Sequence, residues 1–293
     1  MSTGSVTVTG EQELDPSGVT EVLDLVRAAR AADGVEPISE HALLQVKHGA
    51  PVTAQHLLAR TPDGTLAGYA HLDLADLAQG PVAELVVHPE YRREGIAKVL
   101  AKSLAGSAKD ERLHLWAHGD HPGAAAFAKS AGFRTKRTLW KMHRWLDEPL
   151  PHAALPPAYG VRQFRPGVDD EAWVRVNAQA FADHPEQGQL TMVDLHQRMA
   201  EPWFDPAGFI LLWRAGNPAE LAGFHWTKVH HAGKANAAVG EVYVLGVAPG
   251  HQGHGLGRTL TVIGLEHLRS RGLHEVMLYV DESNTAAVRT YEG

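Results

Sequence analysis

The chain has 293 residues, of which 44% are hydrophobic, enough for two ordinary domains that each bury a core. The formal net charge of −7 argues against a general nucleic-acid-binding protein, because it implies no basic surface. The absence of cysteine excludes disulfides, thiolate metal ligands and a cysteine nucleophile. The sequence also lacks the apolar run of a membrane span and the features of a secretory signal, so we expect a cytoplasmic protein.

The first half of the sequence predicts a helix, a strand, a glycine-bearing turn and further helix. Apolar residues recur at helical spacing over residues 19–26, in "VTEVLDLVRAARAAD". The stretch "LVVHPEYRREGIAKVLAKSL", from Leu85, predicts a strand as far as a proline-marked turn and a helix after Gly95. "LHLWAHGDHPGAAAFAKSAGF" then predicts a strand, a polar turn and an alanine-rich helix.

The same order of elements recurs in the second half. "DDEAWVRVNAQAFAD" predicts a helix, and "LGVAPGHQGHGLGRTLTVIG" lies over the first glycine-bearing stretch at an offset of 160, the difference between Gly255 and Gly95. "VMLYVDESNTAAVRTYEG" repeats the strand, polar turn and helix. We therefore predict two similar domains over residues 1–147 and 161–293, joined by a proline-rich linker over residues 148–160.

The glycine-bearing turns are candidate anion sites. Gly253, Gly255 and Gly257 would let backbone N–H groups approach a ligand where a helix begins, an arrangement that favours a pyrophosphate. A tight turn built for conformational freedom is the alternative, but two such turns at matching positions favour a ligand. Neither the P-loop pattern nor the dinucleotide-binding glycine pattern is present in the required context.

The second turn, "QGHGLG" from Gln252, resembles the Q/R-x-x-G-x-G/A signature of the GNAT family of N-acetyltransferases, and "RREGIA" from Arg92 resembles its variant form. The resemblance implies an α/β (α+β) fold of two tandem GNAT domains. Each would be a mixed, mostly antiparallel sheet flanked by helices, with a splayed strand pair that binds acetyl-CoA. The sequence stops at "YEG", where members of the family usually continue into closing strands, so the second domain looks truncated.

The resemblance also implies an acetyl-CoA site in each domain, with the loop amides on the pyrophosphate. In the second half it assigns to this ligand Leu245, Gly246, Val247, Gln252, Gly253, His254, Gly255, Leu256, Gly257, Arg258, Asn284 and Arg289. In the first half it assigns Leu85, Val86, Val87, Arg92, Arg93, Glu94, Gly95, Ile96, Ala97 and Lys98.

Acetyl transfer to an amine needs a proton acceptor, because only the neutral amine attacks and roughly a tenth of a free α-amino group is neutral at pH 7. A carboxylate can take the proton, and a phenol can serve the departing thiolate. Glu241 opens the strand before the second turn, and Tyr291 shares a helix face with Asn284, a predicted N-cap. Spacing alone would leave a solvated strand end and a packing residue. The resemblance assigns Glu241 and Tyr291 as the catalytic pair.

The first half lacks this pair. Subtracting 160 from Glu241 gives Pro81, and the helix alignment places Ala128 opposite Tyr291. Glu84 is three residues beyond Pro81 and would face the other side of the sheet unless a bulge intervenes. We therefore expect the first domain to bind acetyl-CoA without catalysing transfer.

The acceptor follows from the resemblance alone. The tandem arrangement, "AFADHPEQG" and "FHWTK" are similar to actinobacterial GNAT members that acetylate the cysteinyl amine of cysteinyl-glucosaminyl-inositol. The acceptor residues it implies are Glu36, Asp183, Lys228, Glu241 and Tyr279, for which surface solvation is the alternative. We expect a monomer with this small-molecule partner and with no nucleic-acid or membrane partner.

Two other functions stay open: acetylation of another small-molecule or protein amine, and a non-enzymatic acetyl-CoA sensor. A metal is not expected, because the best pair among 19 histidines, His251 and His254, lies inside the proposed loop without a completing ligand set. His230 and His231 are interpreted as an exposed turn.

Overall fold

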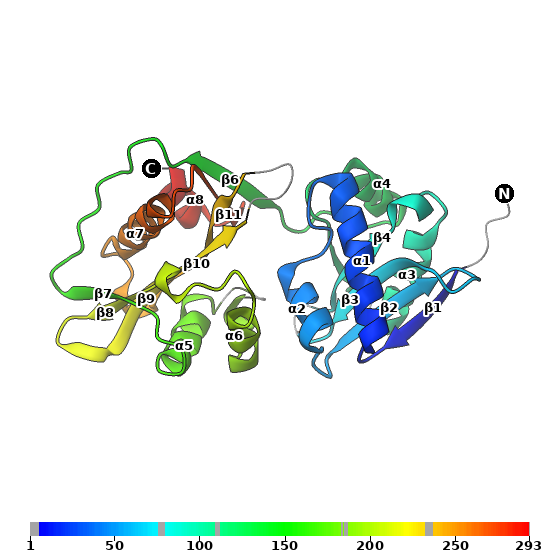
Figure 1. Cartoon of the computed structure of the whole chain (residues 1–293), viewed down its shortest axis with the longest axis horizontal. Coiled ribbons are helices and arrows are strands. Elements are labelled where there is room, and N and C mark those ends of the chain that lie inside the picture. The colour runs from blue at the N-terminus through cyan, green and yellow to red at the C-terminus, as the bar shows by residue number, and fades with distance from the viewer. Residues whose placement is uncertain are drawn as a thin grey trace. The chain divides into compact units, whose positions relative to one another are not determined.

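The computed structural model describes residues 6–75, 80–108, 112–182, 184, 187–231 and 237–292. The chain divides into two compact units, Met1–Arg134 and Thr135–Gly293. Each contains one sheet with helices packed on it (Figure 1). The two sheets repeat the order of elements that the sequence predicts.

The first unit is a five-stranded sheet in the order β1-β2-β3-β4-β5, antiparallel except for the parallel pair β4 and β5. One buried cluster packs the first helices against one face, and another packs the third helix against the opposite face. The strands are β1 (Thr7–Glu11), β2 (Ala54–Arg60), β3 (Leu66–Asp73), β4 (Val82–Val87) and β5 (His114–Trp116). The helices are α1 (Pro16–Asp33), α2 (Glu40–His48), η1 (Pro89–Tyr91), α3 (Ile96–Ser107) and α4 (Pro122–Ser130).

The second unit is a six-stranded sheet in the order β6-β11-β10-β9-β8-β7, in which β10 and β11 form the parallel pair. Its strands are β6 (Leu139–Trp145), β7 (Tyr159–Gln163), β8 (Phe209–Arg214), β9 (Asn217–His230), β10 (Val239–Val247) and β11 (Glu275–Asp281). Its helices are α5 (Asp170–Ala180), η2 (Gln187–Gln189), α6 (Met192–Met199), η3 (Pro206–Gly208), η4 (Pro249–His251), α7 (Leu256–Ser270) and α8 (Thr285–Glu292).

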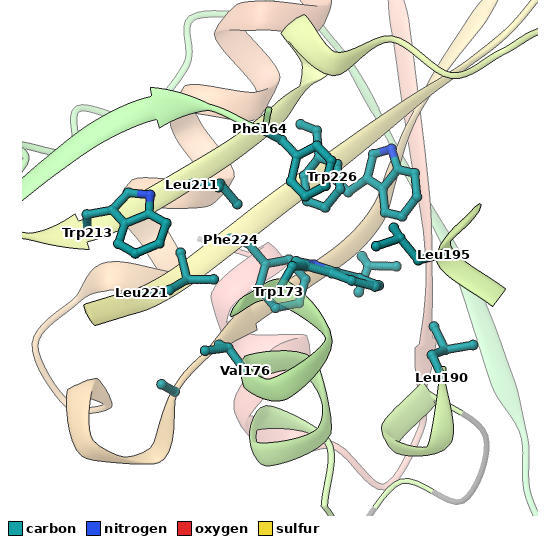
Figure 2. Packing of buried hydrophobic residues seen from close by; sticks show 13 residues of the cluster. Phe164, Trp173, Val176, Leu190, Leu195, Leu211, Trp213, Leu221, Phe224 and Trp226 are labelled. Atoms are coloured by element: carbon teal, nitrogen blue, oxygen red, sulfur yellow. The ribbon is translucent and has the colours of Figure 1, made fainter. Parts of the chain in front are cut away.

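An aromatic cluster fixes α5 to one face of the second sheet (Figure 2). The Phe209 ring stacks on Phe164 with centroids 4.2 Å apart and on Trp226 with centroids 4.3 Å apart. Trp173 of α5 meets Phe209, Phe224 and Trp226 edge-on. Residues that alternate with these along the strands face α7 instead, as His225 does when its Nδ1 lies 2.8 Å from the carbonyl oxygen of Leu260.

The boundary expected at residue 147 differs from the structure. The strand that follows α4, β6, pairs antiparallel with β11 from Leu139↔Asp281 to Trp145↔Glu275. Leu146 is fully buried in the cluster under α7. Residues 135–147 therefore lie in the second unit, because β6 supplies the hydrogen-bonding partners for an edge of β11 that would otherwise stay open.

The proline-rich segment also belongs to the second unit. After β6 it contains no helix or strand until β7 begins at Tyr159, so the last two residues of the expected linker, 159 and 160, lie in the sheet. The segment connects the two edge strands of one sheet and contacts α7 on the way, where the Thr259 hydroxyl donates to the carbonyl of Ala154 at 3.3 Å. The proline-rich segment therefore runs within the second unit and does not link the two units.

Candidate active site

The loop before α7 is open in front of the helix. Gly255 is the N-cap residue in the left-handed conformation (φ 73°) without a side-chain cap, and Gly253 has φ 80°. A Cβ added at Gly253, Gly255 or Gly257 would meet no atom within 4 Å. The glycines therefore leave open space at the first turn of α7, where the sequence predicts an anion site.

The loop before α3 has the same backbone. Gly95 is a left-handed N-cap with φ 86°, and Arg93 takes the place of Gly253 with φ 70° although it is not glycine. The Arg92 Nε donates to the carbonyl of Val87 at 3.3 Å, and Gln252 Nε2 makes the equivalent bond to Val247 at 3.2 Å. The shared Q/R position therefore ties each loop to the end of the preceding strand.

The parallel strand pair beside each loop is short. β10 and β11 pair only at Gly240↔Val276 and Glu241↔Met277, although β10 continues to Val247. In the first unit β4 and β5 pair from Val82↔His114 to Glu84↔Trp116. In the second unit both strands continue past these pairs without pairing to each other, as a splayed pair would. In the first unit β5 ends with its last pair, at Trp116, while β4 continues to Val87, so the expected splay of this pair stays a prediction.

Glu241 lies where β10 and β11 part. Its side chain is mostly buried, and its Oε2 is 2.6 Å from Nε2 of His230, at the end of β9. The interpretation of His230 as part of an exposed turn is therefore wrong. Register across the strands, which cannot be read from the HH pair itself, brings the imidazole to the carboxylate.

Lys228 is the β9 partner of Glu241 and is held against aromatic rings. Its Nζ lies 4.4 Å from the ring centroid of Trp203 and 5.0 Å from that of Tyr243, distances at which a cation is attracted to a ring face. Arg198 Nε in turn donates to the Tyr243 hydroxyl at 2.9 Å. Sequence reasoning found Lys228 but missed these neighbours. Tyr243 shares the face of Glu241 by strand alternation, but Trp203 and Arg198 come from segments distant in the chain, which spacing does not reveal.

Tyr291 lies on the opposite face of the sheet. It packs in the cluster of Val242 and Leu265, and it lines a pocket with Arg258, Val242 and Met142. Burial raises the pKa of Tyr291 to about 12. Because Val242 alternates with Glu241 along β10, the phenol and the carboxylate lie on the two sides of the strand pair.

The N-terminus of α8 is capped as predicted. The Asn284 Oδ1 accepts from the backbone N–H of Ala287 at 3.1 Å. The corresponding cap of α4 is His121, and the difference between residues 284 and 121 places Ala128 opposite Tyr291, as the sequence alignment expects. The first unit has no phenol at this position.

The first unit places an acid differently from the sequence alignment. The caps Asn284 and His121 are 163 residues apart, and the same offset makes His114 the counterpart of Met277. Val82 pairs with His114 and Glu241 pairs with Met277, so Val82 rather than Pro81 matches Glu241. The bulge in β10 supplies the additional residue, and Glu84 then lies on the same face as Val82.

Glu84 is occupied by its own fold. It is buried, and its Oε2 accepts from the backbone N–H of Ser39 and lies 3.1 Å from His118 Nε2. Burial raises the pKa of Glu84, but the contacts with His118 and Ser39 outweigh it, so that the pKa lies below its usual value. Both partners hold the carboxylate against the segment that begins α2.

The remaining expected acceptor residues are only partly brought together. Tyr279 lies two residues after Met277 on β11, so it shares a face with Glu241 and Lys228, and it is 56% exposed. Glu36, in the first unit, pairs with Arg30 at 2.6 Å. Asp183 lies outside the described residues.

No group of three or more metal-ligating side chains occurs among the residues that the structure describes. His251 contacts Glu220 through Nε2 at 3.0 Å and the Tyr159 hydroxyl through Nδ1 at 3.1 Å. None of the helices within the described ranges combines the length and apolar character needed to cross a membrane.

The family model of the acetyltransferase (GNAT) family matches residues 25–133 and 173–292. The chain therefore belongs to the GNAT family of acetyltransferases, and the predicted fold of two tandem GNAT domains is confirmed. Acetyl-CoA is the acetyl donor of this family, so the chain is an acetyl-CoA-dependent N-acetyltransferase.

Two relatives within the family are similar to the chain over nearly its full length. The chain is 54% identical to the mycothiol acetyltransferase of Salinispora arenicola, over 98% of this chain and 92% of that protein. It is 52% identical to the mycothiol acetyltransferase of Thermobispora bispora, over 98% of this chain and 95% of that protein.

Two solved structures are similar over almost the whole chain. A GCN5-related N-acetyltransferase from Sphaerobacter thermophilus has a TM-score of 0.63 and 25% identity, covering 97% of this chain and 90% of its own. A tandem GNAT protein from the clavulanic acid biosynthesis pathway has a TM-score of 0.64 and 22% identity, covering 97% and 93%. The second similarity shows the shared fold.

Proposed function

We propose that the chain transfers the acetyl group of acetyl-CoA to the cysteinyl amine of cysteinyl-glucosaminyl-inositol, the last step of mycothiol biosynthesis, and that the second unit performs the chemistry. Relatives named mycothiol acetyltransferase, about half identical over nearly the full chain, support acetyl transfer in mycothiol biosynthesis. The observation that carries the site assignment is the buried carboxylate of Glu241 where β10 and β11 part, with Tyr291 on the other face.

The donor would bind along the second loop and the strand gap. The open N–H groups at the start of α7 suit the pyrophosphate, since a helix N-terminus attracts an anion. The backbone of Leu245, Gly246 and Val247 is unpaired on the β11 side and can bond an extended amide chain. The thioester would then lie between the two strands, next to Glu241.

Deprotonation of the amine and stabilisation of the departing thiolate would take place on opposite sides of the gap. Glu241 takes the proton of the acceptor ammonium, directly or through a water, and the neutral nitrogen attacks the thioester carbon. The carbon–sulfur bond then breaks, the nitrogen releases its second proton to solvent to become the amide, and the thiolate is left on the Tyr291 side. Because its pKa is about 12, the Tyr291 phenol stays protonated at neutral pH and can donate a hydrogen bond to that sulfur.

The acceptor would lie on the face that holds Glu241, Lys228 and Tyr279. A positive charge at Lys228, the neighbour of Glu241 across the strands, disfavours the ammonium form of the incoming amine. Glu36 and Asp183 remain proposed acceptor residues on the strength of the family resemblance. The first unit, with its matching loop, is proposed to bind a second acetyl-CoA without turnover.

The proposal is tested by mass spectrometry of the product after incubation of the full chain with acetyl-CoA and the cysteinyl acceptor. We expect one acetyl group on nitrogen, so that the product still reacts with a thiol-alkylating reagent. Glu241→Gln should lower kcat by roughly 10²–10⁴-fold, the usual contribution of a general base. Glu84→Gln, the matched change in the first unit, should leave kcat unchanged.

Different failures point to different conclusions. Bound acetyl-CoA without product would favour another amine acceptor or an acetyl-CoA sensor. Full activity in Glu241→Gln together with loss in Glu84→Gln would move the chemistry to the first unit.

A further inference from the structure

The imidazole of His230 lies between the buried carboxylate of Glu241 and solvent. Its Nε2 is 2.6 Å from Oε2 of Glu241, and the two side chains are 40% and 11% exposed. β9 and β10 pair at Val239↔His230 and Glu241↔Lys228, so these side chains share one face and the imidazole reaches the carboxylate diagonally.

This contact uses one of the two carboxylate oxygens. Within the described part of the chain, the structure gives Oε1 of Glu241 no hydrogen-bond partner, and Oε1 is not among the buried side-chain atoms that lack one. With Oε2 engaged by the imidazole, Oε1 is the oxygen that would take the proton of an acceptor amine. A neutral imidazole can donate its Nε2–H to Oε2 and leave the other oxygen free.

Lys228 is the other basic side chain on this face. Lys228 directs its ammonium over the rings of Trp203 and Tyr243. In the first unit the corresponding arrangement is different, because Glu84 is bound by the Ser39 backbone as well as by His118. Among the residues that the structure describes, the recorded partner of the Glu241 carboxylate is one half-exposed ring.

We propose that His230 is a positioning residue for the acetyl transfer: its Nε2–H fixes Oε2 of Glu241 and turns Oε1 toward the acceptor amine. The inference rests on the proposed function of Glu241 as the general base. Without the imidazole, the carboxylate samples other rotamers and points its free oxygen at the amine less often.

The test compares kcat and KM of full-length His230→Ala, His230→Gln and Glu241→Gln proteins, singly and in combination. For His230→Ala we expect kcat to fall by about tenfold to a hundredfold, because the variant loses a hydrogen bond to a charged group. The KM for acetyl-CoA should be nearly unchanged. His230→Gln should recover part of the loss, because its amide N–H can donate to the same oxygen. In the Glu241→Gln background, His230→Ala should cause little further loss.

The matched control is His118→Ala in the first unit, which removes an imidazole 3.1 Å from a buried glutamate and should leave kcat unchanged. An equal loss from His230→Ala in both backgrounds, or a loss confined to KM, would overturn the proposal, because neither acts through the carboxylate.

A solution measurement separates this proposal from the acceptor assignment. The imidazole nitrogen resonances of His230 should move on Glu241→Gln whether or not cysteinyl-glucosaminyl-inositol is the acceptor. An unchanged Nε2 resonance would show that the contact is absent in solution and would overturn the proposal, whereas a shifted resonance without product would count only against the acceptor.

Discussion

At the scale of single residues, Asp169 joins the start of α5 to the neighbouring edge strand. Its carboxylate accepts from Arg162 at 2.5 and 2.6 Å and from the Arg165 backbone at 2.8 Å. Burial raises the pKa of Asp169, but the bonds from the two arginines outweigh this effect and lower the pKa to about 2. The carboxylate therefore favours the folded state most when it is ionised.

Asp169→Asn should lower the free energy of unfolding by roughly 2 kcal/mol at pH 7, since each unit of pKa shift corresponds to about 1.4 kcal/mol. The folded-state pKa is lowered, so this contribution is complete above about pH 4 and disappears as the pH falls through about 2. Urea unfolding followed by tryptophan fluorescence at pH 7 and near pH 2 measures the difference.

The control is Asp147→Asn, whose carboxylate is 70% exposed beside His274 and which should change stability by less than about 0.5 kcal/mol. A gap between wild type and Asp169→Asn that stayed constant with pH would show that packing, rather than ionisation, carries the effect.

At the scale of elements, β6 decides where the second unit begins. It pairs with β11 along its whole length, and the next residue, Leu146, is fully buried in the cluster beneath α7. A strand after α4 could equally have closed the first sheet, whose edge strand is β5. Local sequence predicts a strand but does not choose its partner, because pairing depends on residues far along the chain.

Leu146→Ala should therefore destabilise the second unit, by about 2–4 kcal/mol, through lost burial and a residual cavity. Hydrogen exchange followed by mass spectrometry should show faster exchange in peptides from α7 and β11 and unchanged exchange in α1 and β3. Leu139→Ala, at an exposed position of the same strand, should have little effect. Faster exchange confined to the first unit would contradict the pairing of β6 with β11 and would place β6 in the first sheet.

At the scale of the whole molecule, the two units share the backbone of the loop but differ at the positions of the proposed catalytic pair. Both loops have a left-handed glycine before the helix and a Q/R side chain bonded to the strand end. In the second unit Glu241 lies at the start of the strand gap and the phenol of Tyr291 on α8, whereas the first unit has Val82 and Ala128 at the matching positions. Because both units have the loop and the proposed catalytic residues are in the second, we expect two acetyl-CoA sites and one active site.

Gly257→Glu and Ala97→Glu test the two sites separately. Each places a carboxylate in the first turn of its helix, where it favours the helix dipole but repels a pyrophosphate. Calorimetric titration should give two acetyl-CoA per wild-type chain and one per variant chain, without loss of thermal stability. Only Gly257→Glu should abolish product formation. A wild-type stoichiometry of one, abolished by Gly257→Glu alone, would show that the first unit does not bind the donor.

The sequence by itself determined the repeat, the order of elements and the two glycine-bearing loops before α3 and α7, because these depend on local periodicity and on glycines at fixed offsets. With the family resemblance it also assigned Glu241 and Tyr291 as a catalytic pair, and that assignment stays a prediction. Asn284 was predictable as a cap because an N-cap bonds within its own first turn.

Only the tertiary structure decided which residues meet across strands. The bulge at Tyr243 shifts the register by one residue, which moves the match of Glu241 from Pro81 to Val82 and brings Glu84 onto the same face. The contact of His230 with Glu241 and the pairing of β6 with β11 have the same origin. Such contacts depend on strand register and on partners distant in the chain, which the pattern of a single segment does not encode.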